Sequence, residues 1–437
     1  MATTDRYQAA HVITKDAQDR WLSPGVVDVV DGRITWVGTP EDAPPLEDGQ
    51  VHDVRGALLP GFVDTHAHTP MVLLRGAGEG LPVDRWLTEV MWPREAQLTE
   101  DDVRVGMTFG AAQLLTNGWT TSAEMYFHPD AMADGAQAAG LRCVIGPPLL
   151  VAEGMEALGP WEQQLESAVA FAERYRDVPT IDGAISPHSA YAVSEVPLRE
   201  AGRVAADQDL LLHTHVAEMQ HEGDEITAEH GVTVPRYLES IGVLEAQVLA
   251  AHGVWLTDDD IACLAEHRVG VAHCPGSNGK HASGTAPVTE LKAAGVPVAI
   301  ATDGPASHDR LDPFEEMRLA IRTARLRAGQ ADAMSAADAL TMVTRDAATA
   351  LGRDDLGAIE AGRRADLLAI DTAAPDLVPV TEPGDLLTHL VWSGSPSLVR
   401  RVWVDGREVV TDGQAVEVDA ATLAADVTSR ARRLAVG

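Results

Sequence analysis

Cysteine is scarce in this chain of 437 residues. The three cysteines, Cys143, Cys263 and Cys274, are an odd number, and no two of them have C-x-x-C spacing. This pattern argues against a disulfide framework and against a zinc site built from cysteines. The simplest location for such a chain is a reducing cytoplasm.

Long apolar runs and positive charge are also lacking. No stretch approaches the ~20 apolar residues that span a bilayer, and residues 1–5 do not open a signal peptide. Only 33 basic residues occur beside 66 acidic ones, which gives a formal charge of −33. Because a field of that sign repels nucleic acid and anionic membranes, we expect neither as a partner and favour a small-molecule substrate.

The remaining composition is typical of a globular protein, with 45% apolar and 23% charged residues. The chain is too long for one domain of ~100–200 residues. Its length fits a (β/α)8 barrel of ~250 residues with a smaller companion domain.

Eight short apolar runs alternate with amphipathic stretches through the middle of the chain, as is typical of βα units around a parallel sheet. Strands are predicted at residues 59–68, 121–127, 142–150, 181–188, 210–215, 248–254, 269–274 and 298–303. Helices between them are predicted, for example, at residues 101–116, 161–175, 258–267 and 313–327. Eight strands favour a closed barrel, and no G-x-G-x-x-G motif follows the first, which argues against a dinucleotide site.

The two ends of the chain have hairpin patterns with Asp-Gly turns. Strands are predicted there at residues 11–13, 26–30, 33–37, 365–370, 399–404 and 407–410. Neither end can bury a face alone, so we predict one composite β-sandwich formed by residues 1–58 and 362–437. The barrel then comprises residues 59–361, and residues 420–436 are predicted to form a terminal helix.

His66 and His68 form the most informative pair in the sequence. Residues i and i+2 of a strand point to the same side, so both side chains project together. At the carboxyl end of a first barrel strand they would enter the mouth where barrel enzymes keep their chemistry. Taken alone, the pair also fits two hydrogen-bonded histidines near a loop.

Further titratable residues end four of the other predicted strands. The fourth, sixth and eighth strands end near His188, His252 and Asp303, and the fifth ends with His213 and His215. Because all these ends meet at one rim of a barrel, we expect a shared site. Histidine nitrogens and a carboxylate suit zinc or ferrous iron, with a position left for water. Spacing alone leaves His213 and His215 both open as ligands, since both face the same side.

The chain resembles the amidohydrolase superfamily, and within it the branch of 5'-methylthioadenosine and S-adenosylhomocysteine deaminases and the s-triazine hydrolases. The resemblance covers nearly the whole chain. Besides the His-x-His pair, it rests on residues 71–76, 86–95, 124–128, 215–218, 272–278, 299–307, 314–318 and 362–367. The Trp-Pro-x-Glu segment ending at Glu95 and the Asp-Gly-x-x-Ser segment starting at Asp303 are the most specific to this branch.

The resemblance implies a single divalent metal held by His66, His68, His215 and Asp303. Zn²⁺ is the first choice, and the same ligands accept Fe²⁺ or Mn²⁺. In the family pattern a glutamate follows the ligand by three residues, which selects His215 as the ligand. His213 is then expected behind the ligands or in the core. Members of the family often form dimers or tetramers, so a homo-oligomer is also implied.

The resemblance further implies hydrolytic deamination of a ring. Zinc can lower the pKa of a bound water from ~15.7 to ~7, and the hydroxide attacks the carbon that bears the amino group. His252 matches the histidine that contacts this water or the tetrahedral centre. Glu218 is placed to protonate the ring, and Asp303 to pass the proton of water to the departing ammonia. Without the resemblance, Glu218 also fits an acid that stabilises a helix N-terminus.

The substrate residues point to a nucleoside. Glu95 matches the family glutamate that accepts hydrogen bonds from both ribose hydroxyls, and His188 matches the histidine that binds the nucleoside. Trp92 and Ser307 are expected beside the substrate. Glu95 also fits a surface acid of a strongly acidic chain, and Ser307 also fits an ordinary turn serine.

Departures from the family pattern narrow the substrate. Arginines that hold the amino-acid carboxylate of S-adenosylhomocysteine are replaced here by Pro147 and Trp161. An unpaired, desolvated carboxylate costs several kcal/mol, so we expect adenosine, 5'-deoxyadenosine or 5'-methylthioadenosine. His281 and His308 replace the expected leucine and asparagine, so another heterocycle (a pterin, a guanine derivative or an s-triazine) is the alternative. A catalytically inactive scaffold is the remote alternative, because inactive relatives lose metal ligands and this chain has all the expected ones.

Overall fold

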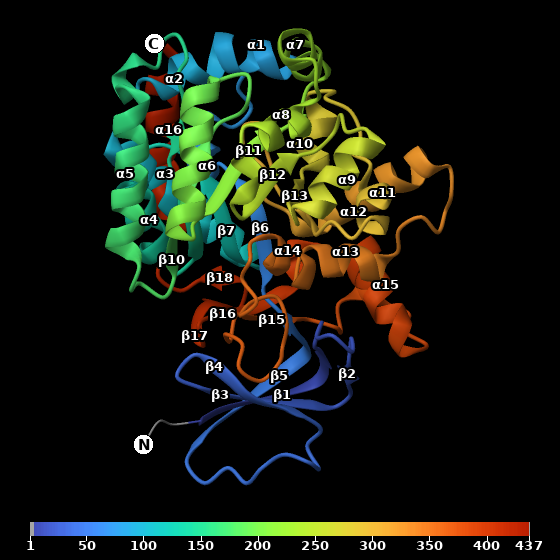
Figure 1. The fold of residues 1–437 in the computed structure, drawn as a ribbon. Helices are drawn as coiled ribbons and strands as arrows, with labels where there is room; N and C mark the ends of the chain where they lie inside the picture. The colour runs from blue at the N-terminus through green and yellow to red at the C-terminus, as the bar shows by residue number, and fades with distance from the viewer. Residues whose placement is uncertain (1–3, 437) are drawn as a thin grey trace.

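The computed structural model describes residues 4–436, in which two sheets organise the chain (Figure 1). The first sheet is parallel, and its neighbouring strands in chain order are β6 (Phe62–Ala67), β7 (Trp119–Met125), β8 (Arg142–Gly146), β10 (Ile181–Pro187), β11 (Leu211–Val216), β12 (Val248–His252), β13 (Gly270–His273) and β14 (Val298–Ile300). A parallel bridge between Ala67 and Asp303 joins the last strand to the first. The predicted (β/α)8 barrel and its eight strands are therefore confirmed.

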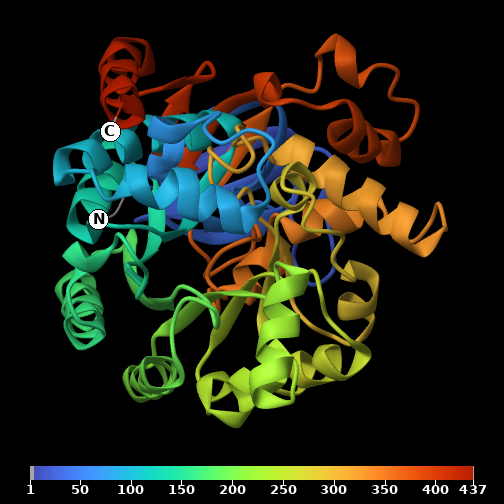
Figure 2. The same cartoon turned by 90° about the horizontal axis from the view of Figure 1, so that it is seen from above.

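Helices surround the barrel, as the view from above shows (Figure 2). Helix α3 (Glu100–Asn117) begins with a capping box, in which Thr99 and Asp102 each accept the other's backbone N–H, and ends at Gly118 with φ +101°. The other helices are α1 (Val83–Trp86), α2 (Trp92–Glu95), α4 (Pro129–Ala139), α5 (Trp161–Tyr175), α6 (Glu195–Gln208), α7 (Gln220–His230), α8 (Val234–Ser240), α9 (Asp258–Glu266), α10 (Pro275–Lys280), α11 (Val288–Ala293), α12 (Pro313–Ala328), α13 (Ala336–Met342), α14 (Arg345–Ala350), α15 (Pro383–Ser393) and α16 (Ala420–Val436).

The second sheet combines both ends of the chain and lies below the barrel in Figure 1. Its strands in spatial order are β18 (Gln414–Ala415), β17 (Arg407–Thr411), β16 (Val399–Val404), β15 (Leu367–Ile370), β5 (Gly49–Pro60), β1 (Thr4–Ile13), β3 (Gly25–Val30) and β4 (Arg33–Gly38), and β2 (Trp21–Leu22) pairs with β1. Tyr7, Leu58 and Trp403 lie in an apolar core of its own. The composite β-fold of the termini is confirmed, while the domain limits stay predictions.

Several strand boundaries differ from the sequence prediction: β1 begins at Thr4 rather than at residue 11, and β14 ends at Ile300 rather than at residue 303. Residues 59 and 60 end β5, and the first barrel strand begins only at Phe62. Gly61 between them packs so closely on Thr120 that a Cβ would meet its Oγ1 at 2.1 Å. The predicted strand at 142–150 is split at Pro147 into β8 and the short β9 (Pro148–Leu149), which pairs with β10. Proline has no N–H for the ladder, so the strand breaks there.

A buried ion pair ties the barrel to the terminal sheet. Arg142 donates from Nε and Nη2 to the two carboxylate oxygens of Asp366 at 2.8 and 2.9 Å. The same carboxylate accepts the backbone N–H of Asp405 at 2.7 Å, next to the turn of the last hairpin. The predicted terminal helix is confirmed as α16, which packs on α3 through ion pairs of Arg430 with Asp101 and Asp102.

The three cysteines are buried and free. Among the described residues, we find no helix that combines the length and the apolar character needed to cross a membrane.

Candidate active site

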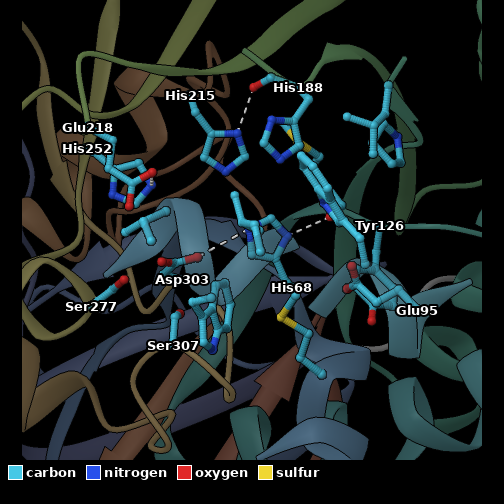
Figure 3. Close-up of a pocket in the computed structure, with 18 of the residues that line it drawn as sticks. His68, Glu95, Tyr126, His188, His215, Glu218, His252, Ser277, Asp303 and Ser307 are labelled. Carbon is cyan, nitrogen blue, oxygen red and sulfur yellow. Dashed lines mark hydrogen bonds and ion pairs between the residues drawn. The ribbon is translucent and has the colours of Figure 1, made fainter. Parts of the chain in front are cut away.

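Five titratable side chains meet at the carboxyl ends of four barrel strands. Figure 3 shows four of them, His68, His215, His252 and Asp303. His66 lies near the end of β6 and His68 directly after it, His215 lies in β11, His252 ends β12 and Asp303 follows β14. His252 and Asp303 have φ of +73° and +59°, so the backbone turns sharply at both points. The barrel topology thus brings together residues that are up to 237 positions apart, from 66 to 303.

These side chains form two overlapping groups that could hold a metal ion. His66, His68 and Asp303 make one group, and His66, His215 and His252 make the other, with the candidate ligand atoms of each group within 4.8 Å of one another. The Nε2 atoms of His66 and His68 lie 3.4 and 3.2 Å from Oδ1 of Asp303. A cation at this point would be reached from three strands.

Hydrogen bonds to backbone carbonyls fix how two of the imidazoles are turned. Nδ1 of His68 lies 2.6 Å from the Met125 carbonyl, and Nδ1 of His215 lies 2.7 Å from the His188 carbonyl. A carbonyl only accepts, so both Nδ1 atoms carry the proton and both Nε2 lone pairs are left for a metal. This is the orientation that metal-binding histidines adopt.

His66 is oriented by a second histidine in the same way. Its Nδ1 lies 2.7 Å from Nε2 of His213, while its own buried Nε2 has no hydrogen-bond partner among the described residues. With the His66 lone pair on Nε2, the Nδ1–H donates to His213. His213 therefore uses its Nε2 behind the site, so the geometry favours His215 over His213 as the residue that faces the shared point.

A buried carboxylate lies beside this group. Glu218 follows β11, and its Oε2 is 3.8 Å from Nε2 of His252. Nδ1 of His252 lies 3.0 Å from the amide oxygen of Asn278, and Glu222 accepts the backbone N–H of Glu218 at 3.0 Å. Glu218 is thus held by its backbone, and its side chain is free to face a ligand.

One pocket collects nearly all the predicted residues. Its lining includes His68, Trp92, Glu95, His188, His215, Glu218, His252, His281, Asp303 and Ser307. His66 is fully buried against His68, His215 and His252. Glu95, at the end of α2, lies across the pocket from Glu218 and beside Tyr126 (Figure 3). Two carboxylates therefore face the pocket from opposite sides of the metal group.

Ser307 and His308 have different surroundings. Oγ of Ser307 donates to the Gly304 carbonyl at 2.9 Å and accepts the Gly304 N–H at 3.0 Å, so it stabilises the turn after Asp303 while lining the pocket. His308 instead pairs with the buried Glu316, with Nε2 and Oε1 2.6 Å apart. The structure therefore gives His308 a partner in α12 rather than a place in the pocket lining.

Comparison with known proteins agrees with this geometry. Residues 57–409 match the amidohydrolase family, which is most of the chain. The chain belongs to the amidohydrolase family. The amidohydrolase chain is 40% identical over 392 residues to a 5-methylthioadenosine/S-adenosylhomocysteine deaminase of Haloarcula marismortui. The match covers 86% of this chain and 88% of that one.

Two further relatives extend the comparison. The amidohydrolase is 38% identical over 401 residues to a 5'-deoxyadenosine deaminase of Methanothermobacter thermautotrophicus, covering 89% of this chain and 90% of that one. Its fold matches the crystal structure of an adenosine deaminase from Xanthomonas campestris with bound zinc, with a TM-score of 0.92 and 31% identity over 100% of this chain and 99% of that one.

The electrostatics of the amidohydrolase site suit a divalent metal. Burial lowers the pKa of His66 to about 4 and that of His215 well below its usual value, so both rings are neutral, as metal ligation requires. Burial raises the pKa of Asp303, but His66 and His68 outweigh it and hold that pKa well below its usual range. Burial opposes protonation of His68, yet without a metal its hydrogen bond to Asp303 raises its pKa to about 9, so a cation bound here would take the place of the proton on Nε2. The site thus attracts positive charge.

A second cavity adjoins the pocket on the side of Glu95. Glu95, Phe127 and Pro148 border both spaces. The remaining lining of the second cavity is mostly apolar: Ala96, Leu98, His128, Pro129, Pro147, Gly154, Met155, Ala157, Leu158, Gln164 and Ser167. Among these described residues there is no arginine or lysine. We call this space the side chamber.

Several residues of the pocket were not predicted from the sequence. Trp86 and Ser277 lie inside the family segments, so those segments could have flagged them. Tyr126 also lies in one, but nothing there indicates that its ring faces the pocket. Tyr191 follows β10 in a loop, where no periodic pattern indicates which way an aromatic ring points.

Proposed function

We propose that this amidohydrolase is a metal-dependent hydrolytic deaminase of adenosine-like nucleosides, which releases ammonia and an inosine-type product. The observation that carries the proposal is the position of two buried carboxylates, Glu218 and Glu95, on opposite sides of the histidine and aspartate group. The names of the relatives support the same reaction. The cytoplasmic location and the homo-oligomer, a dimer or tetramer, stay predictions.

Zinc is the metal that we propose, held by His66, His68, His215 and Asp303. Nε2 of His66 has no partner among the described residues. The Nδ1 atoms of His68 and His215 bond to carbonyls, so their Nε2 lone pairs are available. These nitrogens and the Asp303 carboxylate fit a cation with nitrogen and oxygen ligands. When bound, such an ion supplies the Lewis acidity that makes water nucleophilic near neutral pH. The retained ligand set argues against an inactive scaffold.

Two side chains divide the proton transfers, and a third faces the reacting centre. Burial raises the pKa of Glu218, which favours its protonated form, and we assign this carboxyl group to give a proton to the ring nitrogen next to the reacting carbon. Asp303, which is ionised, accepts one proton of the attacking water and delivers it to the amino group, which leaves as ammonia. The proton that remains on the attacking oxygen returns to Glu218 as the carbonyl of the product forms. His252, which Asn278 orients through Nδ1, faces the same centre with Nε2.

Glu95 and His188 are proposed to bind the ribose end of the substrate. A carboxylate can accept from both ribose hydroxyls at once, and Glu95 is buried at the wall that the pocket shares with the side chamber. The Trp92 ring lies 6.3 Å from the His188 ring, so the two form one wall of the pocket. Ser307 shapes the opposite end through the Asp303 turn.

The side chamber suggests which 5' group the enzyme accepts. Because Glu95 would hold the ribose, the 5' carbon would face the apolar lining around Pro147 and Met155. A methyl or methylthio group is compatible with this lining. The carboxylate of S-adenosylhomocysteine would find no arginine or lysine among the described residues there, and desolvating it unpaired is costly.

A substrate panel tests the proposal. We expect ammonia release from adenosine, 5'-deoxyadenosine and 5'-methylthioadenosine, with kcat/KM about 100-fold or more above that for S-adenosylhomocysteine. The variant Pro147→Arg places a guanidinium at the chamber wall and is expected to raise kcat/KM for S-adenosylhomocysteine alone. An equal or better rate of the unmodified enzyme on S-adenosylhomocysteine refutes the preference. Hydrolysis of a pterin, guanine derivative or s-triazine without any nucleoside activity refutes the nucleoside function.

The pH dependence of KM tests the role of Glu95. Burial raises the pKa of Glu95 to about 7, so the carboxyl group is ionised above this pH and protonated below it. A protonated carboxyl group cannot accept from both hydroxyls, so KM for adenosine should rise about tenfold for each pH unit below the pKa. Glu95→Gln should give a high KM that no longer changes with pH. As a control, 2',3'-dideoxyadenosine should show little of this dependence, and a flat KM for adenosine from pH 5.5 to 8 would contradict the assignment.

A further inference from the structure

His281 is a buried histidine of the pocket for which the reaction above has no use. It directly follows α10, is 7% exposed, and lines the pocket near Trp86 and Ser277. Its ring centre lies 4.8 Å from that of Trp86. Its position therefore depends on packing inside the pocket, and a leucine of the family pattern would fill the same space without polar atoms.

One hydrogen bond determines which nitrogen of His281 carries the proton. Nδ1 lies 3.0 Å from the carbonyl oxygen of Leu81. The carbonyl can only accept, so the proton of the neutral ring is on Nδ1 and Nε2 presents a lone pair. This Nε2 is buried and has no hydrogen-bond partner within residues 4–436. A buried acceptor without a partner is unfavourable, and a donor on the substrate would satisfy it.

The location of His281 indicates which edge of the substrate it meets. Asn278 of α10 lies with its amide oxygen 3.0 Å from Nδ1 of His252, and Nε2 of His252 is 3.8 Å from Oε2 of Glu218. His281 follows Asn278 by three residues, one helical turn, and lines the same pocket as Glu218, so the two side chains lie on the same side of it. In the proposed reaction Glu218 serves the ring nitrogen beside the reacting carbon. The next ring position on that edge of a purine is C2, which carries only hydrogen in adenosine.

We propose that His281 is a specificity-determining residue whose Nε2 accepts a hydrogen bond from an amino group at position 2 of the purine. The inference rests on the proposed function and extends its substrate class to nucleosides that bear a second amino group, such as 2,6-diaminopurine riboside. The 6-amino group remains the one that is hydrolysed. The 2-amino group stays on the product and serves recognition alone.

The test compares two variants of the zinc-loaded full-length enzyme. His281→Leu keeps the volume and removes the acceptor, whereas His281→Gln keeps an acceptor at a similar reach. The measured quantity is kcat/KM for 2,6-diaminopurine riboside divided by that for adenosine. We expect His281→Leu to lower this ratio about fivefold to tenfold, the size of one hydrogen bond, and His281→Gln to restore part of it. An unchanged ratio in His281→Leu overturns the inference, although the deaminase function would remain.

A binding measurement keeps the inference testable without turnover. 2-Aminopurine riboside and purine riboside lack the 6-amino group, so neither can release ammonia from that position. Their Kd values, measured by fluorescence quenching and calorimetry, should differ in favour of 2-aminopurine riboside, and the difference should vanish in His281→Leu. Equal Kd ratios in both proteins overturn the inference. If no nucleoside releases ammonia but the unmodified enzyme still binds 2-aminopurine riboside more tightly than purine riboside, the proposed function is refuted and the role of His281 is supported.

Discussion

Glu218→Gln is expected to lower kcat for adenosine by about 10²- to 10⁴-fold, the usual contribution of a positioned general acid. Glutamine matches the shape of glutamate but has no proton to give to the ring nitrogen. KM should change little, because the amide can still hydrogen-bond the same edge of the substrate. Steady-state ammonia release, together with the metal content of the purified protein, measures both quantities.

The matched control for this change is Glu225→Gln in α7. Glu225 is exposed, so the same chemical change there should leave kcat within about twofold. Glu218 is not among the candidate metal groups, so Glu218→Gln should retain its metal. A variant with full metal and unchanged kcat would remove Glu218 from the proton transfers.

The barrel was predictable because of how its strands are buried. Strands of a parallel sheet that is covered on both faces form continuous apolar runs, and every residue of β7, β11 and β12 is buried. The sequence pattern of β5 is different. Its first seven residues are mostly polar and exposed, and apart from Val54 only Ala57–Pro60 are buried, so nothing in the sequence marked Gly49–Pro60 as one strand. Its place between β1 and β15 comes from long-range pairing.

The site was predictable up to the rotation of individual side chains. The ends of the barrel strands share one rim, so His66, His68, His252 and Asp303 could be assigned to one site from their positions alone. The choice between His213 and His215 could not be made from spacing, because alternate residues of a strand face the same side. In the structure it depends on the contact between Nδ1 of His66 and Nε2 of His213.

His215→Ala and His213→Ala are expected to differ sharply in metal affinity. Removing His215 deletes a nitrogen that faces the shared point, so the purified variant should contain little zinc and show no measurable deamination. Removing His213 deletes only the group that receives the Nδ1–H of His66, and such outer partners cost about 10- to 100-fold in metal affinity or activity. Zinc titration against a competing chelator, followed by kcat/KM at saturating zinc, separates the two.

The reversed result has a definite meaning for the architecture. If His213→Ala lost the metal and His215→Ala kept it, the metal would have to bind on the side of His66 that faces His213. The ring centres of His66 and His213 are 4.9 Å apart in the structure. The Nδ1 of His215, which now meets the His188 carbonyl, would then have only a structural role. Because both residues are buried in the same strand, a general loss of packing should affect the two variants alike. A large difference between them in zinc affinity therefore reports on coordination rather than on folding.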